Sequence, residues 1–243
     1  MKIALEISYL GTNYAGWQKQ KSEPSIAEII ELAYKEKFNE QISLIGSGRT
    51  DAGVHAFAQI AHFDTEISIK PEKIAIALNT ALPNDIRIIK SYEVAKDFHS
   101  RFSAKKKTYE YLMYISKIEN VFLVNRALMI SEELNIEKMK EASQILIGKH
   151  DFTTFCKQKS SEKDCIREIY DIQIMNNLNV ISLKITGNGF LHNMVRIIAS
   201  TLIEVGKGKL TKEDVENILK QKDRTKAPRT APSYALYLKE VSY

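Results

Sequence analysis

The spacing of hydrophobic residues predicts alternating short strands and helices in the first hundred residues of the chain. Ile3, Leu5 and Ile7 recur at every second position, as they would on one face of a half-buried strand that spans residues 2–10. Ser25, with Glu28 three residues later, forms a capping-box pattern that predicts the start of a helix. The further elements expected in this half are strands at 41–45, 57–63 and 85–94 and a helix at 71–81.

The second half of the chain begins near residue 106 and mixes strands and helices without a regular order. The expected strands lie at 107–114, 167–175, 180–186 and 234–241, and the expected helices at 136–147, 190–205 and 211–220. Gly148 and Gly206 are expected to end the first two helices. An asparagine-rich turn at 176–179 joins two of the strands as a hairpin. The hairpin and the irregular order favour an α+β fold with a largely antiparallel sheet over a doubly wound parallel one.

The composition is that of a globular protein, with 44% hydrophobic and 27% charged residues. We place a boundary near residue 105, between an N-terminal half (1–105) and a C-terminal half (106–243). No stretch has the apolar length that spans a membrane. The N-terminus, with Glu6 inside its apolar part, is a poor signal peptide. We therefore expect a cytoplasmic protein.

The cysteines and the net charge exclude few classes of function. Cys156 and Cys165 lack the paired spacing and the nearby histidines of a structural zinc site, and they give no disulfide framework. The net charge of +5 is modest, but basic residues cluster at 105–107 and at 220–229. Such clusters are typical of surfaces that bind a phosphate backbone. On charge alone, a solvated surface is the somewhat better interpretation.

The most informative segment is GSGRTDAGVHA at residues 46–56, which has three glycines within eight residues. Glycines this dense indicate unusual backbone angles or a close approach by another group. A Walker A phosphate loop would end in Gly-Lys-Ser/Thr, which is missing here. Asp51 and His55 could be metal ligands, but no third ligand is evident nearby. The residue types alone leave a functional loop and a purely structural turn about equally favoured.

The segment GRTDAGVHA resembles the signature of the tRNA pseudouridine synthase A family. Further family motifs follow in the same order along nearly the whole chain: YAGWQKQ at 14–20, FHSRFSAKKKTYEYLMY at 98–114, HDFTTF at 150–155, GFLHNMVR at 189–196 and APSYALYL at 231–238. The resemblance implies an enzyme that converts uridine to pseudouridine without a cofactor or a metal. It also implies two ferredoxin-like α+β halves around a central cleft, a homodimer, and a target at positions 38–40 of the tRNA anticodon stem-loop.

The resemblance assigns roles to individual residues. Asp51 corresponds to the catalytic nucleophile, and a carboxylate suits this role because it is ionised at neutral pH and can attack covalently. Arg196 corresponds to the arginine that pairs with it, because a buried carboxylate without a cation would be neutralised. Tyr109 matches the tyrosine that stacks on the target base, and Leu236 matches the apolar wall opposite. Arg49 should face the RNA and occupy the space of the flipped base.

The same resemblance favours a phosphate-binding role for Lys105, Lys106 and Lys107, because they lead directly into the strand of Tyr109. The role of the 220–229 cluster stays open. One alternative is a pseudouridine synthase of the same fold that acts on other tRNA positions or on another RNA. Another is an RNA-binding module without catalytic activity, which the intact Asp51, Arg196 and Tyr109 argue against.

Overall fold

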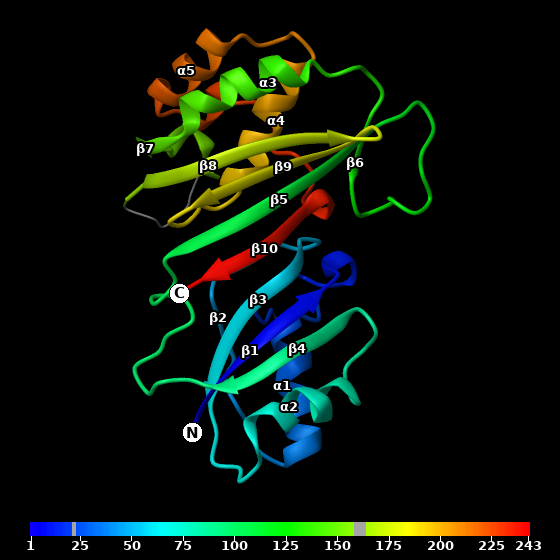
Figure 1. The fold of residues 1–243 in the computed structure, drawn as a ribbon, viewed down its shortest axis with the longest axis vertical. Helices are drawn as coiled ribbons and strands as arrows, with labels where there is room; N and C mark the ends of the chain where they lie inside the picture. Colours follow the sequence, from blue (N-terminus) through cyan, green and yellow to red (C-terminus); the bar gives the residue numbers. More distant parts are fainter. Residues whose placement is uncertain (21–22, 158–163) are drawn as a thin grey trace. The chain divides into compact units, whose positions relative to one another are not determined.

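The computed structural model describes residues 1–20, 23–157 and 164–243, and the chain forms two compact units (Figure 1). Residues 1–105 and 237–243 form the first unit, and residues 106–236 form the second. The sequence boundary assigns the last strand to the C-terminal half, whereas this strand belongs to the sheet of the first unit. The reason is its pairing: Tyr237 and Leu238 lie opposite His55 and Ala56 in a parallel ladder.

The first unit has a four-stranded sheet in the order β4–β1–β3–β10, with β2 added to the edge of β3. Its strands are β1 (Lys2–Tyr9), β2 (Ile45–Gly46), β3 (His55–Asp64), β4 (Ile86–Glu93) and β10 (Leu236–Ser242). β1 is antiparallel to both β3 and β4, and α1 (Ile26–Phe38) and α2 (Pro71–Asn79) cover one face of this sheet (Figure 1). The alternation of Ile3, Leu5 and Ile7 thus forms a buried strand face, as predicted.

Helix α1 shows how local sequence signals and packing agree. The Ser25 side chain accepts a hydrogen bond from the Glu28 backbone N–H, which caps the helix at the predicted place. The Glu28 carboxylate lies 3.1 Å from Lys19 Nζ. Along the buried side of α1, the Tyr34 ring meets the Phe63 ring of β3 edge-on, with centroids 5.0 Å apart. This contact fixes the helix on the sheet.

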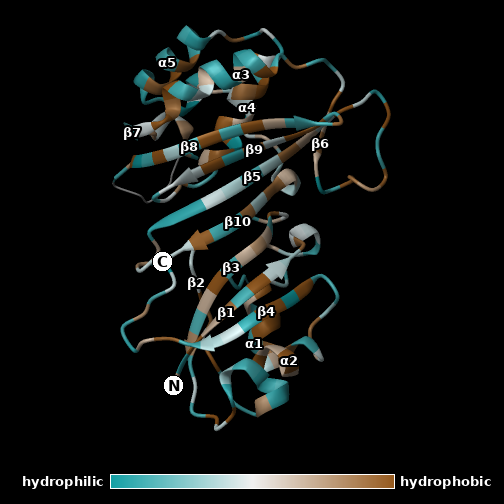
Figure 2. Cartoon of the chain, viewed as in Figure 1, coloured by the Kyte–Doolittle hydropathy of each residue, from teal (hydrophilic) through white to brown (hydrophobic). Residues whose placement is uncertain are grey.

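The second unit has an antiparallel sheet in the order β5–β9–β8–β7, with the short β6 parallel to β5. Its strands are β5 (Lys106–Ile115), β6 (Leu128–Ile130), β7 (Gly148–Asp151), β8 (Ile166–Asn177) and β9 (Val180–Gly187). Its helices are α3 (Ile136–Ser143), α4 (Met194–Gly206) and α5 (Lys212–Gln221). Hydrophobic residues run along α4, whereas α5 is mostly hydrophilic on its outer side (Figure 2). Helix α4 is therefore the core helix of this unit.

Several predicted boundaries are wrong, each for a local reason. The strand expected at 41–45 is only the two-residue β2. Helix α4 begins at Met194 rather than at 190, because Asn193 has a left-handed φ of 64°. Gly148 does not end α3, which stops at Ser143; it is the first residue of β7. By contrast, the predicted end of α4 is confirmed to within one residue, because Gly206 is the last residue of the helix. An added Cβ at Gly206 would be 2.7 Å from the Met139 sulfur, so this glycine also serves close packing with α3.

Short 3-10 helices lie at Gly11–Asn13 (η1), Gln144–Leu146 (η2), Thr153–Phe155 (η3), Arg224–Lys226 (η4) and Ser233–Ala235 (η5).

The fold class is confirmed: each unit combines helices with a largely antiparallel sheet. The predicted hairpin joins β8 to β9 through Leu178 and Asn179, whose φ angles of 49° and 68° are those of a type I′ turn. Within the described ranges, no helix is long and apolar enough to cross a membrane.

A buried histidine ties the segment that follows β4 to the sheet of the first unit. His62 of β3 is 2% exposed, and its Nδ1 accepts a hydrogen bond from the Ser100 backbone N–H at 3.2 Å. The Ser100 hydroxyl lies 2.9 Å from the same nitrogen and donates to the carbonyl of Ile45 at 2.6 Å. Burial, together with the charges of Lys2 and His99, lowers the pKa of His62, so the folded protein favours the neutral ring.

We predict that protonation of His62 destabilises the protein in acid. Because its pKa is lower in the folded state, its contribution is fully present above pH 6.5, the ordinary value, and is lost as the pH falls through the folded pKa. In His62→Asn, the amide oxygen can still accept the Ser100 N–H but does not titrate. Urea unfolding from pH 7.5 to 5.5 should show a steeper loss of stability in the wild type than in His62→Asn. Equal slopes would contradict this assignment.

Candidate active site

The loop between β2 and β3 carries Arg49 and Asp51, and its first half is bonded to β3. The Ser47 backbone N–H donates to the carbonyl of Ile60 at 2.7 Å. The Ser47 hydroxyl donates to Gln59 Oε1 at 2.6 Å, and Gln59 Nε2 donates back to the carbonyl of Gly48 at 3.0 Å. Ser47 and Gln59 are both fully buried. The loop therefore leaves the sheet in a fixed direction.

Thr50 holds the middle of the loop against β1. Its hydroxyl lies 2.9 Å from the Tyr9 hydroxyl, and its carbonyl accepts the backbone N–H of Trp17 at 3.1 Å. Burial raises the pKa of Tyr9 to about 12, although hydrogen bonds to Thr50 and Gln59 oppose the shift, so the phenol stays neutral at physiological pH. With Thr50 buried, its neighbours take the outer side: Arg49 is exposed and Asp51 is half-buried.

Asp51 opens a tight turn that leads into β3. The backbone N–H of Val54 donates to the carbonyl of Asp51 at 3.1 Å, which closes a four-residue turn. Gly53, the third residue of this turn, has a φ of +79°, a left-handed value that glycine adopts without steric cost. The Gly53 N–H also donates to the carbonyl of Tyr14 at 3.4 Å. The dense glycines thus serve a defined turn at Asp51.

Two glycines outside the loop let the backbone of residues 11–17 approach it closely. An added Cβ at Gly16, whose φ is +97°, would lie 2.3 Å from the carbonyl oxygen of Thr50. An added Cβ at Gly11 would lie 2.0 Å from the carbonyl oxygen of Val54. The sequence alone identifies YAGWQKQ only as a family motif, and nothing in its residue types predicts this close approach. In the structure, the backbone of this motif lies directly against the Asp51 loop and supports it.

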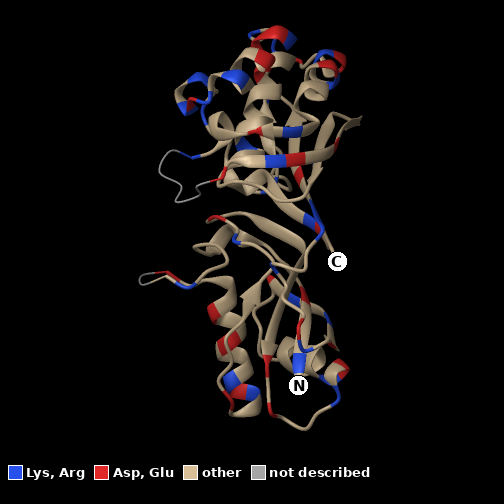
Figure 3. Cartoon of the chain, turned by 90° about the vertical axis from the view of Figure 1, so that its left-hand side faces the viewer, with Lys and Arg blue, Asp and Glu red and all other residues tan. Residues whose placement is uncertain are grey.

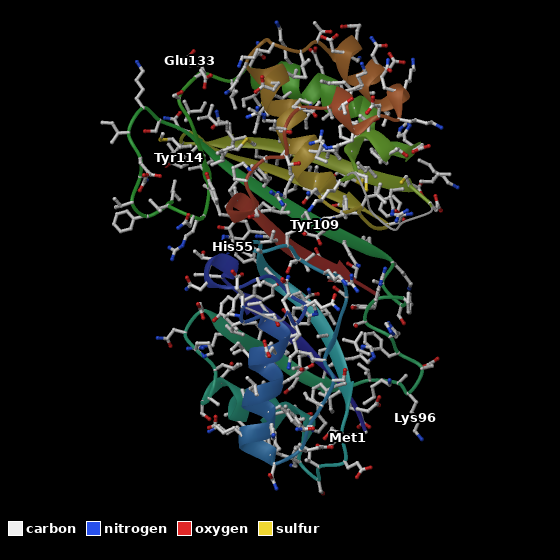
Figure 4. The ribbon with its side chains drawn as sticks, turned by 180° about the vertical axis from the view of Figure 1, so that it is seen from behind. Met1, His55, Lys96, Tyr109, Tyr114 and Glu133 are labelled. Atoms are coloured by element: carbon white, nitrogen blue, oxygen red, sulfur yellow. The ribbon has the colours of Figure 1, made fainter. Side chains whose placement is uncertain are left out.

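His55 has a structural role in this arrangement. It is fully buried, and its Nδ1 accepts the backbone N–H of Gly11 at 2.9 Å, so this nitrogen carries no proton. Its ring lies 4.6 Å from the ring of Tyr237, which comes from β10 (Figure 4 labels His55). In the part of the chain that the structure describes, no three His, Cys, Asp or Glu side chains form a group that could hold a metal ion.

Tyr109 and Arg196 lie in the second unit. Tyr109, on β5 opposite Ile185 (Figure 4), is 9% exposed, and the Phe190 ring meets its ring edge-on at 5.2 Å. Arg196 lies in the first turn of α4 and is half-buried. Its Nε donates to the carbonyl of Ala231 at 2.7 Å, and its Nη1 donates to Asn193 Oδ1 at 2.8 Å. These two bonds hold the guanidinium in one orientation.

The other predicted binding residues differ in exposure. Leu236 begins β10, directly after η5, and is buried. Lys105 and Lys106 are exposed, and Lys107 is half-buried. The structure assigns Arg49, Asp51 and Lys105 to the first unit, and the remaining predicted site residues, Tyr109, Arg196, Leu236, Lys106 and Lys107, to the second.

The 220–229 cluster is largely engaged within its own unit. Lys222 Nζ lies 3.0 Å from Asp151 Oδ2, and Lys220 pairs with Glu216 one turn earlier in α5. Arg224 donates to the carbonyl of Ala227 at 3.0 Å and also to the Thr230 hydroxyl. Basic and acidic residues are mixed in the same way along α1 and on the helices of the second unit (Figure 3). These three basic residues of the cluster thus contact partners within their own unit.

Comparisons with known proteins decide the family. A family model described as tRNA pseudouridine synthase matches residues 6–103 and 142–243. The tRNA pseudouridine synthase A of Thermoanaerobacter pseudethanolicus is 45% identical over 241 residues, which are 99% of either chain. That of Bacillus subtilis is 44% identical over 246 residues, 100% of this chain and 99% of the relative. The chain belongs to the tRNA pseudouridine synthase family.

As a member of the tRNA pseudouridine synthase family, the chain is an isomerase that acts on uridine in tRNA. The family resemblance drawn from the sequence motifs is confirmed. Among solved structures, a Cbf5–Nop10–Gar1 complex is similar at a TM-score of 0.34 and 13% identity, over 83% of this chain and 45% of that one.

We predict that Gly16→Ala displaces the Asp51 loop and reduces tRNA pseudouridine synthase activity at least tenfold. The new methyl group would collide with the Thr50 carbonyl, in addition to the left-handed strain of about 1–2 kcal/mol. Gly208→Ala is the matched control, because Gly208 has a φ of +74° but nothing within 4 Å of an added Cβ. It should carry the strain alone and keep full activity. Activity is measured as release of tritium from C5-labelled uridine in tRNA, and equal losses in both variants would contradict the prediction.

Proposed function

We propose that this enzyme converts uridine to pseudouridine at positions 38–40 of the tRNA anticodon stem-loop, with the Asp51 carboxylate as its nucleophile. The observation that carries the proposal is the Asp51 turn, an intact GRTDAGVHA segment held by β1, β3 and the backbone of residues 11–17. Such rigid support suits a group that must stay in place through several steps on one substrate.

The reaction defines what the site must do. The N1–C1′ bond of uridine breaks, the freed uracil turns, and C5 bonds to C1′. C5 then loses its hydrogen as a proton, and N1 gains one, so atoms and electrons balance without an oxidant or a reductant. A carboxylate that forms a covalent intermediate can keep the base and the sugar together during the turn.

We further propose that both units contribute to the site. Arg196 would pair with the Asp51 carboxylate, Tyr109 would stack on the target base, and Leu236 would form the opposite wall. Local geometry in each unit supports these roles. Arg196 is held by Ala231 and Asn193 at the N-terminal end of α4, where the helix dipole also favours an anion.

Several basic residues would contact the RNA around the target uridine. A target uridine in a stacked stem must leave the stack to react. Arg49, which is exposed beside Asp51, is suited to occupy the space that the base leaves. Lys105, Lys106 and Lys107 would bind phosphates. A homodimer and a cytoplasmic location, where tRNA substrates are found, belong to the same proposal.

We predict that Asp51→Asn abolishes isomerisation but leaves tRNA affinity within a few fold. The amide keeps the size of the side chain but removes the charge and the nucleophile. The assays are tritium release from C5-labelled tRNA and a filter-binding measurement of Kd. Asp64→Asn is the matched control, because Asp64 lies at the exposed end of β3 and pairs only loosely with Lys2, at 3.5 Å. It should remain fully active. A large loss of tRNA binding in Asp51→Asn would instead make Asp51 structural.

We predict that the purified enzyme forms pseudouridine only at positions 38, 39 and 40 of unmodified tRNA transcripts. Transcripts with cytidine at these three positions should release no tritium, and carbodiimide mapping should show no new site in them. Modification at another position would favour the alternative, a pseudouridine synthase of the same fold with a different target. The comparison needs no variant and tests the position separately from the role of Asp51.

A further inference from the structure

Residues 98–103 form a tight loop that is rigid through its own hydrogen bonds. His99 Nδ1 accepts the backbone N–H groups of Arg101 at 3.1 Å and of Phe102 at 3.3 Å. The Ser103 N–H donates to the carbonyl of His99 at 2.9 Å, and the His99 N–H donates to the Ser103 hydroxyl at 3.1 Å. The imidazole of His99 therefore holds the backbone of the loop together through these hydrogen bonds.

The same loop is anchored to the sheet of the first unit at two points. Ser100 is fully buried and bonds to His62 of β3 and to the carbonyl of Ile45. Tyr243, which follows β10, donates its hydroxyl to the carbonyl of Ser100 at 2.7 Å. The ring of Tyr243 also packs on Phe98, with centroids 4.9 Å apart. The loop thus has a fixed place on its unit.

This rigid loop presents an exposed aromatic ring. Phe102 is 76% exposed, although its ring contacts the His99 ring at 4.4 Å with an interplanar angle of 34°. The guanidinium carbon of Arg101 lies 5.6 Å from the centre of the Phe102 ring, within the range of a cation–π contact. Leaving a phenylalanine in water forgoes the stability that burial would give. A ring held in this way is a preorganised contact surface.

The charge around Phe102 indicates what would bind there. The segment from 96 to 107 carries five Lys or Arg residues, Lys96, Arg101, Lys105, Lys106 and Lys107, against one acidic residue, Asp97. Lys96, Arg101, Lys105 and Lys106 are exposed. An exposed ring in contact with one cation, within a segment rich in others, matches a ligand with flat faces and phosphates, which describes a single-stranded nucleotide.

We propose that Phe102, supported by His99 and Arg101, stacks on an unpaired base of the tRNA substrate, while Arg101 and Lys105 bind the adjoining phosphates. The inference rests on the proposed function, because it takes tRNA as the substrate. It adds a binding contact outside the residues assigned to the target uridine. Phe102 would hold a second nucleotide and contribute to the affinity and register of the RNA.

The chain offers a matched control in Phe122. This residue is 79% exposed, like Phe102, but it lies in the loop between β5 and β6 beside the exposed apolar residues Ile118 and Val121. The two phenylalanines therefore share exposure and differ in their surroundings. Substitution of either one should leave the core intact.

The first test measures the Kd of unmodified tRNA for the wild type, Phe102→Ala, Phe102→Trp and Phe122→Ala. Loss of one base stack should weaken binding by Phe102→Ala about 5- to 100-fold, with a parallel rise in KM. Phe102→Trp should stay within about twofold of the wild type, and Phe122→Ala should be unchanged. Arg101→Gln should reduce the slope of log Kd against log salt by about one phosphate contact.

The second test observes the stack directly. Trp17 is the single tryptophan of the chain and is 4% exposed, so its emission is shielded from solvent. Phe102→Trp adds an exposed indole whose emission tRNA should quench, whereas Phe122→Trp should show no quenching. Equal Kd values for Phe102→Ala and the wild type, or no quenching at position 102, would overturn this inference while tritium release still supports the proposed function. A wild type that binds no tRNA would overturn both.

Discussion

The structure of the first unit depends on one close approach between two backbone segments. Residues 11–17 lie so near the Asp51 loop that side chains at Gly11 and Gly16 would overlap the carbonyl oxygens of Val54 and Thr50. The hydroxyls of Tyr9 and Thr50 and the amide of Gln59 fill the buried space behind the loop. Asp51 is therefore carried by a turn that is closely backed by the backbone of residues 11–17. In the nucleophile role proposed for Asp51, such support would limit the entropy lost on reaching the reactive geometry.

The polar side chains of Tyr9 and His55 behind the loop are neutral, so they place no charge next to the Asp51 carboxylate. Tyr9 is buried with its phenol protonated, and His55 accepts a backbone N–H through an unprotonated nitrogen. The hydrogen bonds of Tyr9 to Thr50 and of Gly11 to His55 lie within the first unit, so they add rigidity without adding charge. Of the loop residues 47–54 in the first unit, only Arg49 and Asp51 have side chains that carry a charge.

The sequence predicts elements well where one signal dominates and poorly where packing decides. The alternation of Ile3, Leu5 and Ile7 and the Ser25 cap give β1 and α1, because burial and capping act locally. Gly206 ends α4 close to the predicted place, but its close packing against Met139 of α3 could not be predicted from residue spacing. In the same way, three glycines within eight residues indicate an unusual loop at 46–56, but its support by Tyr9, Gly11 and Gly16 depends on contacts in three dimensions. The pairing of β10 with β3 joins residues far apart in the chain, and no local pattern predicts it.

That pairing has a consequence for biosynthesis. The strand that follows the Asp51 turn has β10 along one edge, yet β10 is translated only after every residue of the second unit. Until then, part of the β3 edge has unpaired N–H and C=O groups, the kind of edge on which strands of other chains add. The second unit is a continuous stretch of the chain, whereas the sheet of the first unit needs a strand from the far end of the sequence. The sheet that carries the Asp51 turn is therefore the last to be completed, although its first strands are translated first.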